Sequence, residues 1–215
     1  MTLNVNILDE IKYFIESEID ELEFAVLFGS HALKNGNLTA DIDFKIFIKS
    51  EASDVLRSHV AVFAKQINQK NSGISILLPK DVPYEIKTVI NKSTLENALN
   101  LKAFLNQNGK FNIPEISFSP EFLLSEECQM RTVLSSLTTP NILIAGSFDL
   151  FSFAQARAFK SIKSLICNVY NIDVNDSRQI LQRLFESPDG RCYKNYLGYK
   201  NNQEIRLHFL QHLFD

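Results

Sequence analysis

The feature that most constrains the fold of this 215-residue chain is a pair of apolar segments separated by a glycine-serine turn. Residues 23–28 are an almost unbroken apolar run, which is typical of a short buried strand. The run stops at Gly29–Ser30, where a polar stretch follows. Residues 42–48 then alternate with a period of two, which predicts a second strand. A β-sheet is therefore expected near the start of the chain.

Helical and strand-like periodicities divide the rest of the chain. Apolar residues at helical spacing predict helices over 7–20, 119–137, 149–170, 176–186 and 202–214. Two more helices are predicted from their capping residues. One follows Ser50 and runs to about 67, and the other opens with a capping box at Ser93–Glu96 and runs to 105. Further strands are predicted over 74–78 and 84–90. The predicted class is α+β, with helices flanking a small sheet. Residues 1–110 form the predicted core domain, and residues 111–215 form a mainly helical domain.

The composition is that of an ordinary globular protein, with 45% hydrophobic and 22% charged residues. A net charge of -3 argues against a protein that coats nucleic acid along its whole surface. No apolar run approaches the roughly 18 residues of a membrane span, so no membrane association is expected. Three cysteines without CxxC spacing are typical of reduced thiols, which predicts a cytoplasmic protein.

Two groups of residues near the glycine-serine turn indicate chemistry. Gly29 allows a close backbone approach, and the N–H groups of the turn, with the Ser30 hydroxyl, are suited to bind an anion. Asp41 and Asp43 lie two residues apart, so a strand places both carboxylates on one face. Paired carboxylates suit Mg²⁺ or Mn²⁺. An anion-binding turn beside a pair of metal-binding carboxylates is typical of enzymes that transfer phosphoryl or nucleotidyl groups.

This pattern resembles the signature of the DNA polymerase beta-type nucleotidyltransferase superfamily, and it is most similar to the minimal and antibiotic nucleotidyltransferases. Gly29, Ser30, Asp41 and Asp43 match the signature residue by residue. Lys34 stands where these proteins often have a basic residue. The resemblance covers about residues 7–91 and implies a small mixed sheet.

The resemblance also implies an activity. Such enzymes transfer a nucleoside monophosphate from an NTP to an acceptor hydroxyl and release pyrophosphate. Gly29, Ser30 and Lys34 would contact the NTP, and three carboxylates would hold Mg²⁺ or Mn²⁺. Glu85 is the candidate for the third carboxylate and for the base, with Asp81 as the runner-up.

Two positions depart from the family pattern. His31 stands where an arginine is common, and Ala40 stands where a serine is common. His31 is expected to be a helix-surface residue rather than a catalyst.

The acceptor is not identified by the sequence. A small molecule is the first expectation, with a protein or an RNA end as alternatives. A second hypothesis is a non-catalytic, antitoxin-like binding protein with the same fold. The sequence fixes neither the base of the NTP nor the oligomeric state.

Three weaker patterns have structural interpretations. Residues 142–151 are similar to the start of a cytidylyltransferase but lack the HxGH histidines, so a helix entry is predicted there. Arg206 and His212 have a spacing found in HEPN-type ribonucleases, which an amphipathic terminal helix also explains. A basic cluster at Arg157, Lys160 and Lys163 is predicted to be a solvated helix face, with contact to an acidic acceptor as the alternative.

Overall fold

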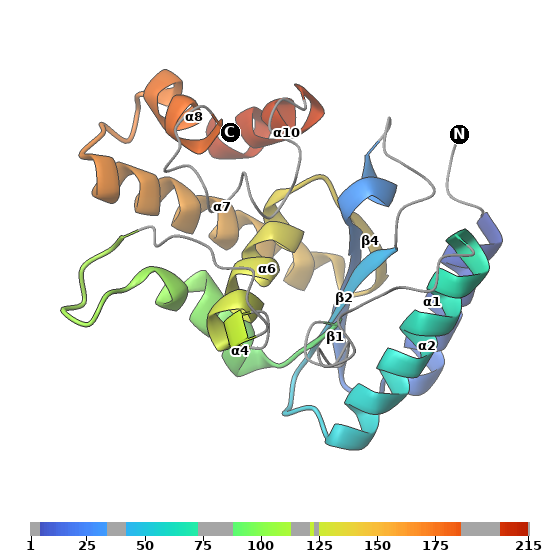
Figure 1. The fold of residues 1–215 in the computed structure, drawn as a ribbon. Helices are drawn as coiled ribbons and strands as arrows, with labels where there is room; N and C mark the ends of the chain where they lie inside the picture. Colours follow the sequence, from blue (N-terminus) through green and yellow to red (C-terminus); the bar gives the residue numbers. More distant parts are fainter. Residues whose placement is uncertain are drawn as a thin grey trace.

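The computed structural model describes residues 5–33, 42–72, 88–112, 121–122, 125–185 and 203–214. In these ranges a four-stranded sheet lies between two groups of helices (Figure 1). The strands are β1 (Leu22–Phe28), β2 (Asp43–Ile48), β3 (Val89–Ile90) and β4 (Ile142–Gly146). The α-helices are α1 (Val5–Glu18), α2 (Asp54–Ser72), α4 (Lys92–Leu99), α6 (Glu126–Thr138), α7 (Phe148–Tyr170), α8 (Ser177–Phe185) and α10 (Gln203–Phe214). Short 3₁₀ turns are η1 (Gly29–Ala32) and η2 (Lys102–Phe104). The predicted α+β class is confirmed.

The sheet is mixed, with the strand order β3-β2-β1-β4. β1 pairs antiparallel with both β2 and β4, whereas β2 pairs parallel with β3. The central position of β1 explains its nearly continuous apolar sequence, because both of its faces are covered. The predicted strand over 74–78 and most of the one over 84–90 lie outside the described residues.

The fourth strand corrects the helix entry predicted for residues 142–146. These residues form β4, and α7 begins only after Ser147, whose hydroxyl accepts a hydrogen bond from the Leu150 N–H. Gly146 permits the pairing, since a Cβ there would lie 2.5 Å from the Glu23 carbonyl oxygen. The Ser147 N–H also donates to that oxygen, at 2.8 Å. A residue range assigned to the helical half therefore completes the sheet of the first half.

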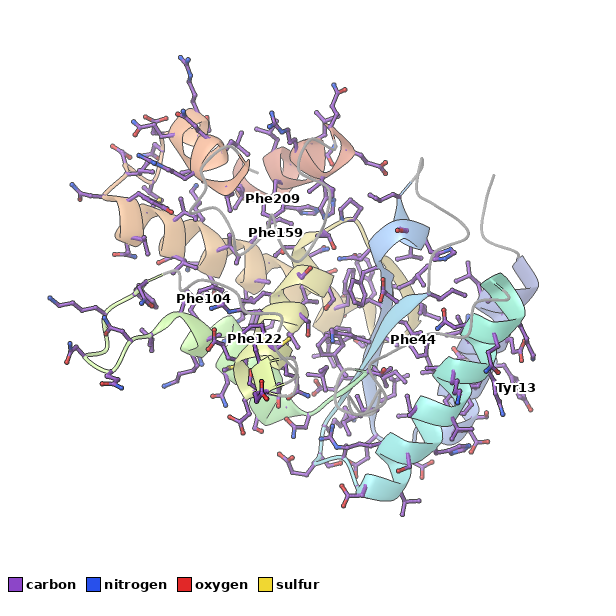
Figure 2. All side chains as sticks on the ribbon, in the orientation of Figure 1. Tyr13, Phe44, Phe104, Phe122, Phe159 and Phe209 are labelled. Atoms are coloured by element: carbon purple, nitrogen blue, oxygen red, sulfur yellow. The ribbon has the colours of Figure 1, made fainter. Side chains whose placement is uncertain are left out.

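One face of the sheet packs against α1 and α2 (Figure 1). Aliphatic side chains of α1 and α2 meet those of β1, β2 and β4 in a buried cluster. Figure 2 labels Phe44 between β2 and α2, where its ring makes an edge contact with Phe63. α2 begins one turn later than the Ser50 cap predicts, because the Ser53 hydroxyl accepts from the Leu56 N–H at 3.1 Å.

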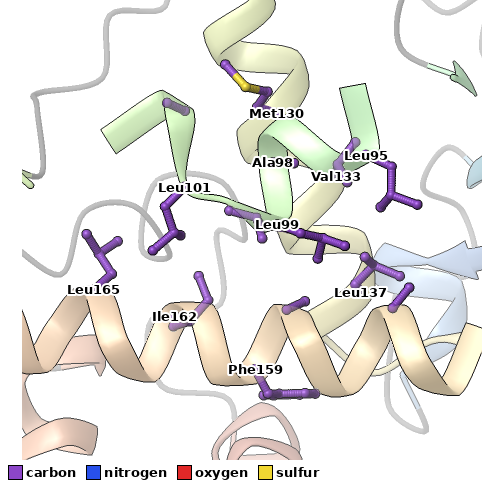
Figure 3. Packing of buried hydrophobic residues seen from close by; sticks show 14 of the residues in the cluster. Leu95, Ala98, Leu99, Leu101, Met130, Val133, Leu137, Phe159, Ile162 and Leu165 are labelled. Atoms are coloured by element: carbon purple, nitrogen blue, oxygen red, sulfur yellow. The ribbon is translucent and has the colours of Figure 1, made fainter. Parts of the chain in front are cut away.

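The opposite face packs against a larger cluster built by α4, α6 and α7, which α8 and α10 extend. Figure 3 shows Leu99, Leu137 and Ile162 at the meeting point of the three helices. The cluster includes side chains from β1 as well as from α10. The predicted boundary at residue 110 stays a prediction, but this core draws residues from both sides of it.

Polar contacts fix α4 against α7. Arg157 donates to both carboxylate oxygens of Glu96, at 2.7 and 2.9 Å, which lowers the pKa of the Glu96 carboxyl. The Ser161 hydroxyl donates to the Leu99 carbonyl at 2.6 Å. Because Glu96 is engaged with α7, the predicted capping box does not form, and the Asn91 side chain accepts from the Thr94 N–H instead. α4 ends at Leu99 rather than at 105.

α10 closes the larger cluster through aromatic contacts with α7. Phe159 packs edge-on against Phe209 and stacks with His212 at a centroid distance of 4.7 Å (Figure 2). His208 lies beside His212, and its burial, with a smaller effect of His212, lowers its pKa to about 4. None of the helices in the described ranges combines the length and apolar character needed to cross a membrane.

The low pKa of His208 predicts a loss of stability in mild acid. The unfolded chain takes up a proton near the ordinary value of 6.5, whereas folded His208 resists protonation down to about 4. Between these values the unfolded state binds more protons, so the free energy of unfolding falls as the pH is lowered. Urea unfolding at pH 7 and pH 5 should show a larger loss for the wild type than for His208→Phe.

His59 on α2 provides the matched control, because it is an exposed histidine. His59→Phe should lose more stability between the two pH values than His208→Phe does. An equal loss in His208→Phe and His59→Phe would show that His208 does not carry the effect.

Candidate functional site

The glycine-serine turn and the Asp43 carboxylate meet at one end of the sheet. Phe28, the last residue of β1, pairs with Asp43, the first residue of β2. Gly29 follows Phe28 with a φ of +71°, a conformation that favours glycine. A Cβ on Gly29 would lie 2.5 Å from the Asp43 Oδ2 atom. The carboxylate therefore packs directly against the turn, in space that only glycine leaves open.

Ser30 lies next in the same turn and is half-buried. Its carbonyl oxygen accepts from the Leu33 N–H at 3.4 Å, which closes the 3₁₀ turn. Gly29, Ser30 and Asp43 are thus the predicted site residues that the structure describes, and they lie at the same sheet end. Lys34, Asp41 and Glu85, together with the runner-up Asp81, lie outside the described residues, so their roles stay predictions.

His31 corrects one expectation about this turn. It is 5% exposed and does not lie on a helix surface as predicted. The cause is the tightness of the 3₁₀ turn, which contacts both β1 and β2.

The entrance to β2 is held by a residue that the sequence reasoning missed. Asn68 of α2 is fully buried. Its Oδ1 accepts from the Ile42 N–H at 2.6 Å, and its Nδ2 donates to the Ala64 carbonyl at 3.0 Å. A side-chain amide that bonds the backbone directly before Asp43 fixes the position at which the carboxylate emerges. The sequence signal for such a role is a polar residue, Asn68, at a position where the apolar stripe of the helix continues.

Lys45 is the second residue that the sequence reasoning missed. It is 2% exposed and lies on β2 opposite Val26, on the face that carries Asp43 and Phe47. Its Nζ atom lies 5.9 Å from the centroid of the Phe28 ring. The period-two pattern of residues 42–48 predicts a polar, solvent-facing strand face for Lys45, but helices cover this face of the sheet. Phe47 lies on the same face, and its apolar side chain is the sequence signal that this face is buried.

The described residues contain no group of three His, Cys, Asp or Glu side chains close enough to share a metal ion. Asp43 is the one predicted ligand among them. Carboxylate oxygens are ligands that a hard cation such as Mg²⁺ prefers. The metal site therefore stays a prediction, as do the parts of Asp41 and Glu85 in it.

Two hollows lie elsewhere in the described structure. One, of about 590 Å³, runs between α7 and α10 and is lined by Phe148, Phe151, Lys160, Lys163 and His212 among others. The other, of about 300 Å³, lies beside the start of α4, between Arg57 and Gln129. Neither includes the glycine-serine turn.

The weaker sequence patterns have structural explanations. Of the basic cluster on α7, Lys160 is exposed, whereas Arg157 pairs with Glu96 and Lys163 donates to the Leu213 carbonyl at 3.2 Å. The prediction of a solvated face is therefore confirmed for Lys160, whereas Arg157 and Lys163 are half-buried and each makes a polar contact with another element. Arg206 and His212 both lie on α10, where His212 stacks on Phe159.

Comparison of the chain with protein-family models, with curated proteins and with solved structures gave no match.

The close approach of Gly29 to Asp43 predicts the effect of one methyl group. Gly29→Ala adds a Cβ onto the Asp43 carboxylate and forces an alanine into the left-handed region, which costs roughly 1–2 kcal/mol. Gly109→Ala imposes the same backbone strain, since its φ is +70°, but its Cβ would meet nothing within 4 Å. We expect Gly29→Ala to lower the free energy of unfolding more than Gly109→Ala, as measured by urea unfolding. Equal losses would contradict the close packing.

Proposed function

We propose that this chain is a metal-dependent nucleotidyltransferase, as the resemblance to the DNA polymerase beta-type superfamily implies. The observation that carries the proposal is the packing of the Asp43 carboxylate against the Gly29–Ser30 turn at one end of a mixed sheet. Gly29 and Ser30 are adjacent in the sequence, so their proximity needs no explanation. Asp43 lies 14 residues after Gly29, so its contact with the turn depends on the fold.

Each residue has a role that follows from its chemistry. The N–H groups of the turn and the Ser30 hydroxyl bind the triphosphate, and Lys34 adds a positive charge. Asp41, Asp43 and Glu85 supply oxygen ligands for Mg²⁺ or Mn²⁺, which would neutralise charge on the phosphates. Because the Asn68 side chain anchors the Ile42 N–H, the backbone directly before Asp43 is held in place, which supports a fixed position for its carboxylate.

The proposed reaction is a substitution at the α-phosphorus of the NTP. The acceptor oxygen forms a bond to phosphorus, and the bond from phosphorus to the bridging oxygen breaks, so that pyrophosphate leaves. Glu85 takes the proton of the acceptor hydroxyl. The proposed acceptor is a small molecule, because residues 101–215 carry 12 Lys/Arg against 11 Asp/Glu and so lack the basic excess that RNA binding favours. A protein acceptor remains an alternative.

A second candidate is a binding protein with the same fold and without catalysis. The observation that favours it is Lys45, a buried cation on the same strand face as Asp43. A positive charge on Lys45 beside Asp43 would reduce the need for a metal ion. This candidate predicts that pyrophosphate is not released with any NTP.

Removal of one carboxylate tests the assignment. Asp43→Asn keeps the size of the side chain but removes the charge, so Mg²⁺-dependent pyrophosphate release should fall by about a hundredfold or more. Asp41→Asn should have the same effect. Asp54→Asn, on the exposed first turn of α2, removes the same charge away from the site and should leave the rate unchanged. Equal rates in the Asp43 and Asp54 variants would sink the proposal.

A further inference from the structure

Lys45 lies in an environment where a charged side chain is costly. It sits in the middle of β2, is 2% exposed, and shares its face with the buried Phe47 and the cross-strand Val26. Removing an ammonium group from water costs several kcal/mol unless an opposite charge compensates it. An aliphatic residue at this position would fill the same space without that cost. The charge of Lys45 therefore calls for an explanation.

The side chain of Lys45 is directed toward the candidate site. Its cross-strand partner is Val26, yet its Nζ atom lies over the ring of Phe28, 5.9 Å from the centroid. Phe28 is two residues nearer to the glycine-serine turn and pairs with Asp43. The Lys45 side chain therefore extends along β2 toward Asp43, and the face of the Phe28 ring stabilises its ammonium group.

Asp43 and Lys45 are next neighbours on one face of the strand. Two residues of strand span about 6.7 Å between Cα atoms, and the lysine side chain leans into that interval. Because Lys45 is buried and Asp43 is half-buried, opposite charges on them attract more strongly than they would in water. From this geometry we propose that Lys45 is the internal counter-ion of the Asp43 site, and that its charge disfavours a divalent ion until a triphosphate is bound. This inference rests on the proposed function.

The consequence is an order of binding. An ammonium close to Asp43 repels a metal ion that arrives alone, so the free protein binds Mg²⁺ or Mn²⁺ weakly. An NTP brings several negative charges to the same place and offsets the repulsion. Metal and nucleotide should therefore bind with positive coupling, each raising the affinity for the other. Lys45 acts through Asp43 in this account and is a positioning residue.

Titration with Mn²⁺, followed by the EPR signal of the free ion, tests the inference without any turnover. Lys45→Met has a similar volume and no charge, so in the absence of nucleotide it should bind Mn²⁺ at least about tenfold more tightly than the wild type. Its positive coupling to ATP should be reduced accordingly. Lys49→Met makes the same change of net charge at an exposed position beyond the other end of β2. It should match the wild type.

The possible outcomes separate the inference from the proposed function. If wild type and Lys45→Met bind Mn²⁺ with equal affinity, the inference is wrong and the metal site stands. If neither protein binds Mn²⁺, with or without ATP, both the inference and the proposed function fail. Tighter binding by Lys45→Met alone supports the inference.

A second measurement on the wild type covers the case in which Lys45→Met does not fold. The Lys45 Cε resonance, assigned by NMR, should shift when Mg²⁺ and ATP are added together, while the Lys49 Cε resonance stays in place. A Lys45 resonance that does not move at saturating Mg²⁺ and ATP would overturn the inference.

Discussion

The contact between Gly29 and the Asp43 carboxylate is the interaction on which the rest of the candidate site depends. It requires the antiparallel register that sets Phe28 opposite Asp43, and it requires a residue without a Cβ at position 29. The two helices that cover one sheet face support it, because Asn68 of α2 fixes the backbone of Ile42 just before the carboxylate. Helices α4, α6 and α7 cover the other face, toward which Asp43 and Lys45 point.

Elements with strong local periodicity were predictable from the sequence. α1, α7, α8 and α10 begin and end within about two residues of the predicted ranges, because each buries an apolar stripe that recurs at helical spacing. Helix starts chosen by residue type were less accurate. Ser50 and Ser93 are the predicted capping residues, but Ser53 and Asn91 cap α2 and α4 instead. Tertiary contacts decide which N–H groups at a helix start are left to be capped.

β4 was not predictable in the same way. Its apolar run is short and stands directly before a good helix cap at Ser147, so local pattern favours a helix entry. Its pairing with β1 depends on a partner more than 110 residues earlier and on the close backbone approach at Gly146. Lys45 was missed for a related reason. Period-two alternation separates two strand faces, but it does not say that helices cover both. The proximity of Gly29 to Asp43, in contrast, followed from the turn and the strand that surround them.

Calorimetric titration with ATP, GTP, CTP and UTP, in the presence and absence of Mg²⁺, tests the central claim most directly. A nucleotide-binding site at the glycine-serine turn predicts saturable binding of at least one NTP that strengthens with Mg²⁺ and is lost in Asp43→Asn. Absence of binding for all four nucleotides, or binding that Asp43→Asn leaves unchanged, would contradict the account.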